Sequence, residues 1–127
     1  IHAGWRGLAD GIIESTLDAL KLPPEDTLVW LGPAIGPTAF EVGKDVYDAF
    51  TAKNKSAKEA FTPLAAETWL ADIFQLATQR LSARHITQIY GGNYCTYTEP
   101  DKFYSYRRCG TTGRMASLIW FEKPKSR

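Results

Sequence analysis

The sequence predicts an α/β (α+β) domain in which two long amphipathic helices pack against three or four short strands. Two observations support this prediction. Apolar residues recur with the period of an α-helix at residues 7–22 and 68–84, and short apolar runs next to Gly or Pro lie at residues 27–31 and 86–90. The chain has 127 residues, of which 44% are hydrophobic, so it is long enough to bury a core as one domain.

The first predicted helix covers residues 7–22. Its apolar and charged side chains lie on opposite faces, with Leu8, Ile12, Ile13, Leu17 and Leu20 on one and Asp10, Glu14, Asp18 and Lys21 on the other. Pro23 and Pro24 end this helix, because proline lacks the N–H that a helix interior needs. The next apolar run, residues 27–31, is predicted to form a strand that stops at Gly32.

A loop rich in glycine and proline, GPAIGPTAFEVG, follows at residues 32–43. Its two Gly-Pro steps restrict the backbone, so we expect a rigid loop with a short extended piece at residues 39–42. Rigid loops at the ends of strands often form the walls of pockets. A wide turn with a purely structural role is an equally good interpretation of the same residues.

The middle of the chain predicts two further helices. The first covers residues 44–53, and the polar residues 54–58 are expected to form a loop after it. The buried face of this helix is expected to hold Val46, Tyr47 and Phe50. The second helix covers residues 68–84 and begins with Glu67 or Thr68 as its cap. Its apolar residues at helical spacing are Leu70, Ile73, Phe74, Ala77 and Leu81.

Two strands are expected in the last third of the chain. Residues 86–90 form the first, which the glycine pair at residues 91–92 closes. Residues 114–121, RMASLIWF, carry a single charged side chain. Such an apolar run is typical of a strand that is buried on both faces of a sheet. We therefore expect the chain to place its last strand inside the core.

The charge and cysteine content exclude several classes of protein. The chain carries 15 Lys and Arg against 14 Asp and Glu, a net charge of +1, without a basic face. We therefore expect neither a nucleic-acid partner nor electrostatic binding to a membrane surface. The sequence has no run of about 20 uncharged apolar residues that would predict a transmembrane helix. Cys95 and Cys109 are too few and too far apart for a disulfide framework, which favours a cytoplasmic location.

The hexapeptide HAGWRG at residues 2–7 is the first candidate site. The His2 imidazole can serve as a metal ligand or a general base, and Gly4 lets a ligand approach the backbone closely. The guanidinium of Arg6 suits phosphate or carboxylate. The alternative is an ordinary turn. One histidine does not make a zinc site, which needs at least three protein ligands, and the only other histidine, His85, lies in an expected exposed turn.

Tyrosine, arginine and glycine are interleaved in the second candidate site, CTYT at residues 95–98, FYSYRR at 103–108 and GTTGR at 110–114. Arginine and aromatic side chains together suit an anionic aromatic ligand such as a nucleoside with phosphate, and Arg107 is a candidate contact. The same side chains can equally tie a loop to the end of a helix. Cys95 has no histidine near it in sequence, so a buried structural thiol is favoured over a nucleophile.

The motifs HAGWRG, GPAIGPTAFEVG and CTYT…FYSYRR…TGRMASLIW occur in this order along the whole chain. Together they resemble the YfiH-like family, whose members are described both as laccase-like multicopper polyphenol oxidases and as purine nucleoside phosphorylases. The resemblance implies a three-layer α/β/α arrangement with a mixed sheet. It also implies that residues 1–127 are the C-terminal part of one larger domain, whose N-terminal half is absent from this sequence.

The resemblance further implies a single metal ion, zinc or alternatively copper, bound by two histidines and one cysteine. His2 matches one of these histidines. The other histidine and the cysteine are expected upstream of Ile1, and neither Cys95 nor Cys109 matches the ligand position. We therefore expect this chain alone neither to bind a metal tightly nor to turn over substrate.

The implied activity is phosphorolysis of adenosine, inosine, guanosine and methylthioadenosine, together with deamination of adenosine. The small-molecule partners are then a purine nucleoside and phosphate, with Gly4, Arg6 and, as a weaker candidate, Arg107 contacting the substrate or phosphate. Zinc with an open coordination position can activate water for deamination. The family also implies two alternatives, a copper-dependent polyphenol oxidase and a hydrolase that edits peptidoglycan precursors. Two histidines in the chain are too few for the copper centres of a laccase.

Overall fold

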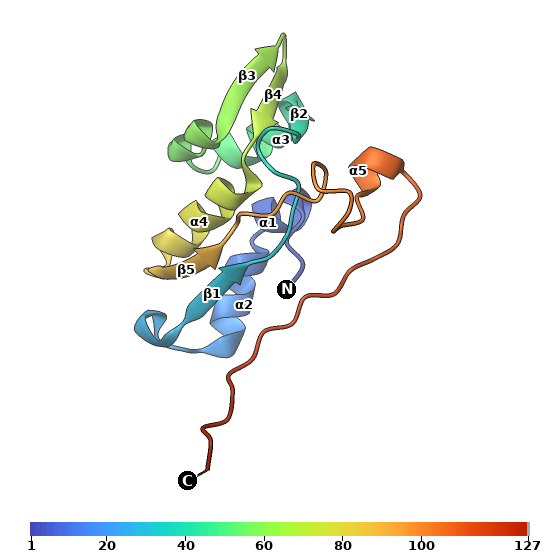
Figure 1. Cartoon of the computed structure of the whole chain (residues 1–127). Coiled ribbons are helices and arrows are strands. Elements are labelled where there is room, and N and C mark those ends of the chain that lie inside the picture. Colours follow the sequence, from blue (N-terminus) through green and yellow to red (C-terminus); the bar gives the residue numbers. More distant parts are fainter. Residues whose placement is uncertain (127) are drawn as a thin grey trace.

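The computed structural model describes residues 1–126, in which the strands form one parallel and one antiparallel sheet (Figure 1). The elements are α1 (Trp5–Asp10), α2 (Ile12–Leu20), the 3-10 helix η1 (Pro24–Asp26), β1 (Leu28–Leu31), β2 (Glu41–Gly43), α3 (Lys44–Thr51), the 3-10 helix η2 (Lys55–Ala60), β3 (Phe61–Ala65), β4 (Thr68–Ala71), α4 (Ile73–Ala83), β5 (Gln88–Gly91) and α5 (Tyr106–Cys109). The predicted α/β (α+β) class with mixed strand directions is confirmed.

The predicted helix 7–22 is divided into α1 and α2 at Gly11. This glycine has a φ of 100°, in the left-handed region, and its N–H bonds to the carbonyls of Gly7 and Leu8. A glycine in this conformation is a common way to end a helix, and the chain then starts a new one in another direction. The first helix also begins two residues earlier than predicted, at Trp5, and the second ends at Leu20 before Lys21 adopts a φ of 53°.

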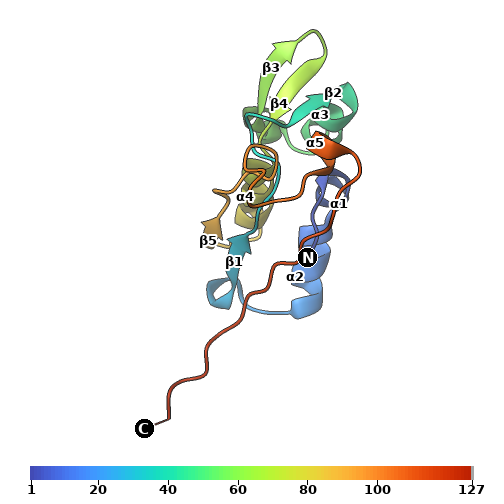
Figure 2. The same ribbon diagram turned by 45° about the vertical axis from the view of Figure 1, so that its right-hand side comes forward.

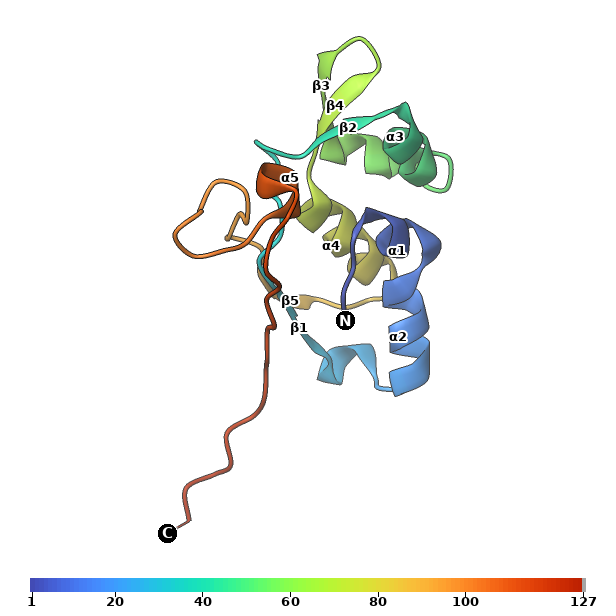
Figure 3. The same cartoon turned by 90° about the vertical axis from the view of Figure 1, so that its right-hand side faces the viewer.

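The parallel pair β1–β5 confirms the two strands predicted at residues 27–31 and 86–90. Leu28 pairs with Gln88 and Leu31 with Gly91, and the helices α1 and α2 lie on one side of the pair (Figure 3). Side chains alternate along both strands. The inner ones, Val29, Leu31 and Ile89, pack against the core, whereas Leu28, Trp30 and Tyr90 are exposed. We call these three exposed residues the outer sheet face.

The antiparallel sheet has the order β2–β4–β3, and neither β3 nor β4 was predicted as a strand. Residues 68–71, predicted as the start of a helix, form β4, and the helix α4 begins only at Ile73. The cap is Asp72, whose side chain accepts a hydrogen bond of 3.0 Å from the N–H of Gln75, so the predicted caps Glu67 and Thr68 are wrong. Glu67 instead has a φ of 57° in the turn between β3 and β4.

Aromatic packing explains why residues 68–71 form a strand. The ring of Trp69 stacks on that of Tyr47, with 4.3 Å between centroids and 10° between planes, and Tyr47 also meets Phe61 edge to face. Tyr47 belongs to α3, so this helix covers the antiparallel sheet. The prediction of α3 is confirmed, and Val46 and Phe50 are buried. The extended piece predicted at residues 39–42 lies slightly later, as β2.

The polar residues 54–58, predicted as a loop, contribute to η2 instead. Asn54 begins this 3-10 helix, because its side chain accepts a hydrogen bond of 3.0 Å from the N–H of Ser56. The buried residues Ala57 and Ala60 then bring η2 against α3 and α4. The short helices η1 and α5 were not predicted either, and Ser105 caps α5 by accepting from the N–H of Arg108.

Residues 114–121 do not form the buried strand that the sequence predicts. They have no regular secondary structure, and Ile119, Trp120 and Phe121 are 72%, 74% and 83% exposed. Within residues 1–126, no strand pairs with them: β1 pairs with β5, and β2, β4 and β3 form the other sheet. We call residues 114–121 the C-terminal segment. In the same described part of the chain, no helix is long and apolar enough to cross a membrane.

Two cationic side chains that are distant in the sequence meet at one backbone carbonyl, that of Ala9 near the end of α1. The Nζ atom of Lys53 donates to it at 2.7 Å, and the Nη2 atom of Arg80 on α4 donates at 3.3 Å. Arg80 also forms an ion pair of 3.2 Å with Glu14 on α2. These contacts place two positive charges at the C-terminal end of α1, where the helix dipole favours them. They therefore fix the first two helices against α3 and α4.

Replacing Arg80 with Met should destabilise the chain, because it leaves the largely buried Glu14 carboxylate without its cation. The Arg80 and Glu14 side chains are only 20% and 23% exposed. We expect the free energy of unfolding in urea to fall by about 2 kcal/mol, the typical range for a lost charge-assisted hydrogen bond. The matched control is Arg84→Met on the same helix, whose partner Asp18 is exposed, and which should cost much less. Equal losses in the two variants would contradict this account.

Candidate functional site

Residues 2–7 border an open hollow at the start of α1. It measures about 300 Å³ and is lined by His2, Gly4, Trp5, Arg6 and Gly7. In Figure 3 the chain rises from the N-terminus into α1. The structure therefore brings together three of the predicted site residues, His2, Gly4 and Arg6. We call this feature the N-terminal hollow.

The His2 side chain lies directly over Gly4. Its Nε2 atom is 3.1 Å from the position that a Cβ atom would take at residue 4, so a side chain there would push the imidazole away. His2 is exposed, and its ring is accessible to a ligand. The φ of Gly4 is −63°, so its backbone conformation does not require glycine. The lack of a side chain at this position instead leaves room for the His2 ring.

The guanidinium of Arg6 is the cation of the N-terminal hollow. Its Cζ atom lies 4.5 Å from the centroid of the Trp5 ring, a cation–π distance that holds the group without neutralising it. Arg6 is exposed and takes no part in the ion pairs formed within residues 1–126. A guanidinium in this state can bind a phosphate or carboxylate through two parallel hydrogen bonds.

Arg107 is not among the residues that line the N-terminal hollow. It lies on α5, where its Nη1 atom donates to the carbonyl of Glu41 at 2.7 Å and its Cζ atom lies 5.4 Å from the Phe40 ring. The side chain is exposed but is engaged with β2 and the residue before it. Arg107 would have to release this carbonyl before it could bind an anion.

The two loops that follow the parallel strands lie side by side. In the sequence they are separate motifs. Ala34 and Cys95 form a parallel bridge, and the N–H of Gly36 donates to the Sγ atom of Cys95 at 3.1 Å. Both loops leave the carboxyl ends of β1 and β5, the edge at which parallel sheets usually bind ligands. That common edge was the signal that could have predicted their contact.

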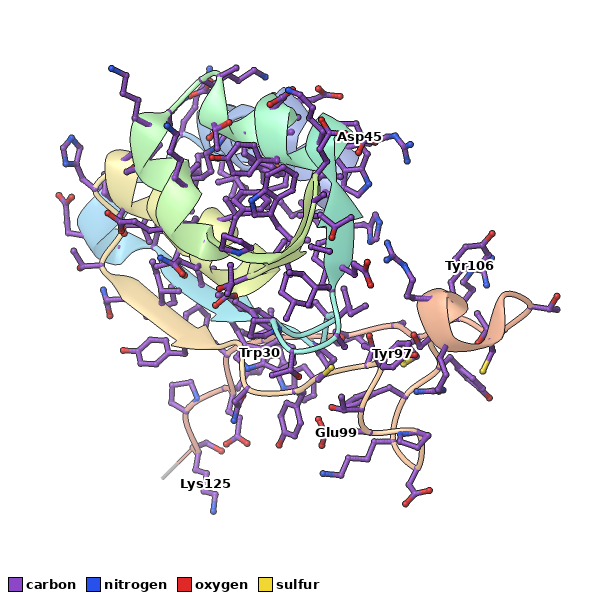
Figure 4. All side chains as sticks on the ribbon, turned by 90° about the horizontal axis from the view of Figure 1, so that it is seen from above. Trp30, Asp45, Tyr97, Glu99, Tyr106 and Lys125 are labelled. Atoms are coloured by element: carbon purple, nitrogen blue, oxygen red, sulfur yellow. The ribbon has the colours of Figure 1, made fainter. Side chains whose placement is uncertain are left out.

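Arg108 ties the second loop together, as one of the two interpretations of this motif predicts. Its Nη1 atom donates to the carbonyls of Thr96 and Tyr97 at 2.8 and 3.0 Å, and its Nη2 atom donates to that of Phe103 at 2.7 Å. The guanidinium is therefore occupied by backbone. Tyr97, Glu99 and Tyr106, which border this loop and α5, project away from the helical core (Figure 4).

The Cys95 thiol is half-buried in the contact between the two loops. Burial raises the pKa of this thiol, but hydrogen bonds from the Thr98 side chain and from the N–H groups of Gly36, Thr98 and Tyr97 outweigh it. The pKa of Cys95 therefore lies below the ordinary value of a thiol. Its place in the loop packing agrees with a structural role for the residue.

The described residues do not complete a metal site. Among residues 1–126, no group of three or more His, Cys, Asp or Glu side chains is arranged to hold a metal ion. His2 is the single candidate ligand in the N-terminal hollow, and His85 lies in an exposed turn with a φ of 64°, as predicted. Since zinc needs at least three protein ligands, this chain by itself does not fit the metal that the resemblance implies.

A family model described as "Multi-copper polyphenol oxidoreductase laccase" matches residues 1–122. The chain is 56% identical over 123 residues to "Purine nucleoside phosphorylase" of Haemophilus influenzae, an alignment that covers 95% of this chain and 50% of that protein. It is 56% identical over 119 residues to "Purine nucleoside phosphorylase YfiH" of Escherichia coli, covering 94% and 49%. The chain thus spans about half the length of these curated relatives.

Two solved structures share the fold. One is the Neisseria meningitidis protein NMB0706, with a TM-score of 0.92 and 49% identity over 96% of this chain and 50% of that chain. The other is the Bacillus licheniformis hypothetical protein YfiH, with a TM-score of 0.79 and 29% identity over 84% and 43%. This chain therefore corresponds to about half of a larger fold. The family model and the relatives confirm the family resemblance drawn from the motifs.

We expect Cys95 to react at a lower pH than an ordinary thiol. Its lowered pKa means that, at a given pH, a larger fraction of Cys95 is the nucleophilic thiolate. In a Cys109→Ser variant, which leaves Cys95 as the only cysteine, the rate of alkylation by iodoacetamide should reach half its maximum below about pH 8.5. Adding Thr98→Val removes one hydrogen bond to the sulfur and should raise this midpoint. A midpoint equal to that of free cysteine would contradict the assignment.

Proposed function

This chain belongs to the family described as multi-copper polyphenol oxidoreductase laccase, and from that membership we propose that it is part of a purine nucleoside phosphorylase. The name comes from relatives that are up to 56% identical to it. The observation that carries the proposal is the N-terminal hollow, in which Arg6 offers an uncompensated guanidinium beside His2.

Phosphorolysis of a nucleoside needs a cation that holds phosphate next to the sugar. A phosphate oxygen forms a bond to C1′ of the ribose while the bond from C1′ to the purine nitrogen breaks, and the purine leaves with the electron pair and takes up a proton. Positive groups placed beforehand stabilise the charge on phosphate without reorganising. Arg6 fits this role because Trp5 fixes its guanidinium at 4.5 Å while leaving its donors free.

The finer parts of the proposal concern the substrates. We expect adenosine, inosine, guanosine and methylthioadenosine as nucleosides, with deamination of adenosine as a second activity. Gly4 keeps the backbone of the N-terminal hollow open to the ligand. Arg107 is a second candidate for the phosphate, although its bond to the Glu41 carbonyl makes it the weaker one.

His2 is proposed as one ligand of a zinc ion, with copper as the alternative. The cysteine and the second histidine would come from the part of the domain that this chain does not span. Zinc with an open coordination position lowers the pKa of bound water, which is the chemistry that deamination requires. In this arrangement Gly4 leaves room for the His2 ring, whose Nε2 atom lies 3.1 Å from the position that a Cβ atom would take at residue 4.

Copper-dependent oxidation of phenols is the second candidate function, favoured by the description of the family model. Of the two histidines in this chain, only His2 lines the N-terminal hollow, whereas His85 lies in an exposed turn apart from it.

Arg6→Met should impair phosphorolysis. The test uses this chain joined to the half of the Haemophilus influenzae relative that it does not match, with adenosine and phosphate as substrates. We expect kcat/KM to fall about 100-fold, with a higher KM for phosphate, because one charged contact to the reacting group is lost. Arg84→Met, far from the N-terminal hollow, is the control. Unchanged kinetics in the Arg6 variant, or oxidation of phenols in place of phosphorolysis, would overturn the proposal.

His2→Gln should abolish stoichiometric zinc in the same completed protein, because a carboxamide is a poor substitute for an imidazole ligand. Zinc bound per chain after dialysis is the measurement, and His85→Gln is the matched control that should retain the metal. The unjoined 127-residue chain should hold no stoichiometric zinc. Full zinc content in the His2 variant would remove His2 from the proposed ligand set.

A further inference from the structure

The arginines of this chain are held in two different ways. Six of them lie within residues 1–126, and five of these donate hydrogen bonds to oxygen atoms of the chain. These five are Arg80, Arg84, Arg107, Arg108 and Arg114. The sixth, Arg6, donates no hydrogen bond within the same residues, and its guanidinium lies over the Trp5 ring instead. Among the arginines of residues 1–126, Arg6 alone therefore keeps its N–H donors free for an external acceptor.

The Trp5 ring is fixed by the core of the chain. It is half-buried and packs against the buried cluster to which Leu8 and Ala9 belong. Figure 2 shows α1 between α2 and α3, and α1 contacts both of these helices. Arg6 is the next residue along α1 and is exposed, with its Cζ atom 4.5 Å from the centroid of the Trp5 ring. The ring thus connects a flexible, exposed side chain to a rigid part of the molecule.

The Trp5 ring restricts the guanidinium without neutralising it. A carboxylate would hold an arginine as well, but it would cancel the charge that an anion needs. Within residues 1–126, no Asp or Glu lines the N-terminal hollow, and the first turn of α1 has no acidic residue. An aromatic ring attracts a cation through its quadrupole and carries no net charge. A side chain that is already ordered in this way loses less conformational entropy when it binds a ligand.

We propose that Trp5 is a positioning residue for phosphate: its ring holds the Arg6 guanidinium in the orientation that binds phosphate in the N-terminal hollow. This inference rests on the proposed function, in which Arg6 is the phosphate contact. It adds that the affinity for phosphate depends on the aromatic face at position 5. Trp5 acts through Arg6.

Two variants of Trp5 separate the effect of its ring from the effect of its bulk. Trp5→Leu keeps an apolar side chain against the core and removes the ring, whereas Trp5→Phe keeps an aromatic face. In the joined protein, with adenosine and phosphate, Trp5→Leu should raise the KM for phosphate about tenfold, because the cation–π contact is lost. Trp5→Phe should raise it by no more than about threefold, since a smaller ring is retained. In both variants the KM for phosphate should rise more than that for adenosine.

A double variant tests whether Trp5 acts through Arg6. In Arg6→Met the guanidinium is already absent, so adding Trp5→Leu should change the KM for phosphate by less than about twofold. Isothermal titration calorimetry with inorganic phosphate, in the absence of a nucleoside, provides a measurement that does not depend on turnover. The dissociation constants of the variants should follow the same order as their KM values for phosphate.

A tryptophan fluorinated on its benzo ring, incorporated at position 5, tests the ring without changing its shape. Fluorine withdraws electron density from the face of the ring, so the cation–π contact weakens while the packing of the side chain is kept. We expect the dissociation constant for phosphate to rise at least about threefold. This variant keeps the test decisive if Trp5→Leu does not fold.

Equal phosphate affinities in the Phe and Leu variants of Trp5, or an unchanged affinity with the fluorinated ring, would overturn the inference. A further loss in the double variant would also overturn it, because Trp5 would then act on the shape of the N-terminal hollow. In each of these cases an impaired Arg6→Met variant would still support the proposed function. Unchanged kinetics of Arg6→Met alone would instead remove the proposed function itself.

Discussion

The carbonyl oxygen of Ala9 is the point on which the helical part of the molecule depends. Lys53 and Arg80 both donate to it, and Arg80 joins it to Glu14 on the next helix. These contacts join α1 and α2 to α4 and to Lys53, just after α3, which are far apart from them in the sequence. Because α1 is only six residues long, its direction is set by this anchored end, and with it the direction of the N-terminal hollow at its other end.

The sequence predicted the two parallel strands, whose causes are local, and missed β4, whose neighbours are distant in the sequence. It also missed η2 and α5, although Asn54 and Ser105 cap them locally. The two parallel strands are short apolar runs between turn residues, and both were found. The strand β4 forms because Trp69 stacks on Tyr47 of a separate helix, which no local pattern reveals. The C-terminal segment has the composition of a buried strand but lacks a neighbour within residues 1–126. An apolar composition therefore indicates that a segment can form a buried strand, but the strand forms only where another strand is present to pair with it.

The candidate site follows the same rule. His2, Gly4 and Arg6 were predicted together and lie together, because they are contiguous in the chain. Arg107, predicted as a partner, is held by the Glu41 carbonyl instead. The contact between Gly36 and Cys95 joins residues 59 positions apart and was not predicted.

The central claim is that Arg6 holds phosphate at the N-terminal hollow of a protein completed by the missing half. A crystal structure of this chain joined to the unmatched half of the Haemophilus influenzae relative, grown with phosphate and inosine, tests it most directly. The account predicts phosphate oxygens within hydrogen-bond distance of the Arg6 guanidinium. Phosphate bound elsewhere, with Arg6 facing solvent, would contradict it.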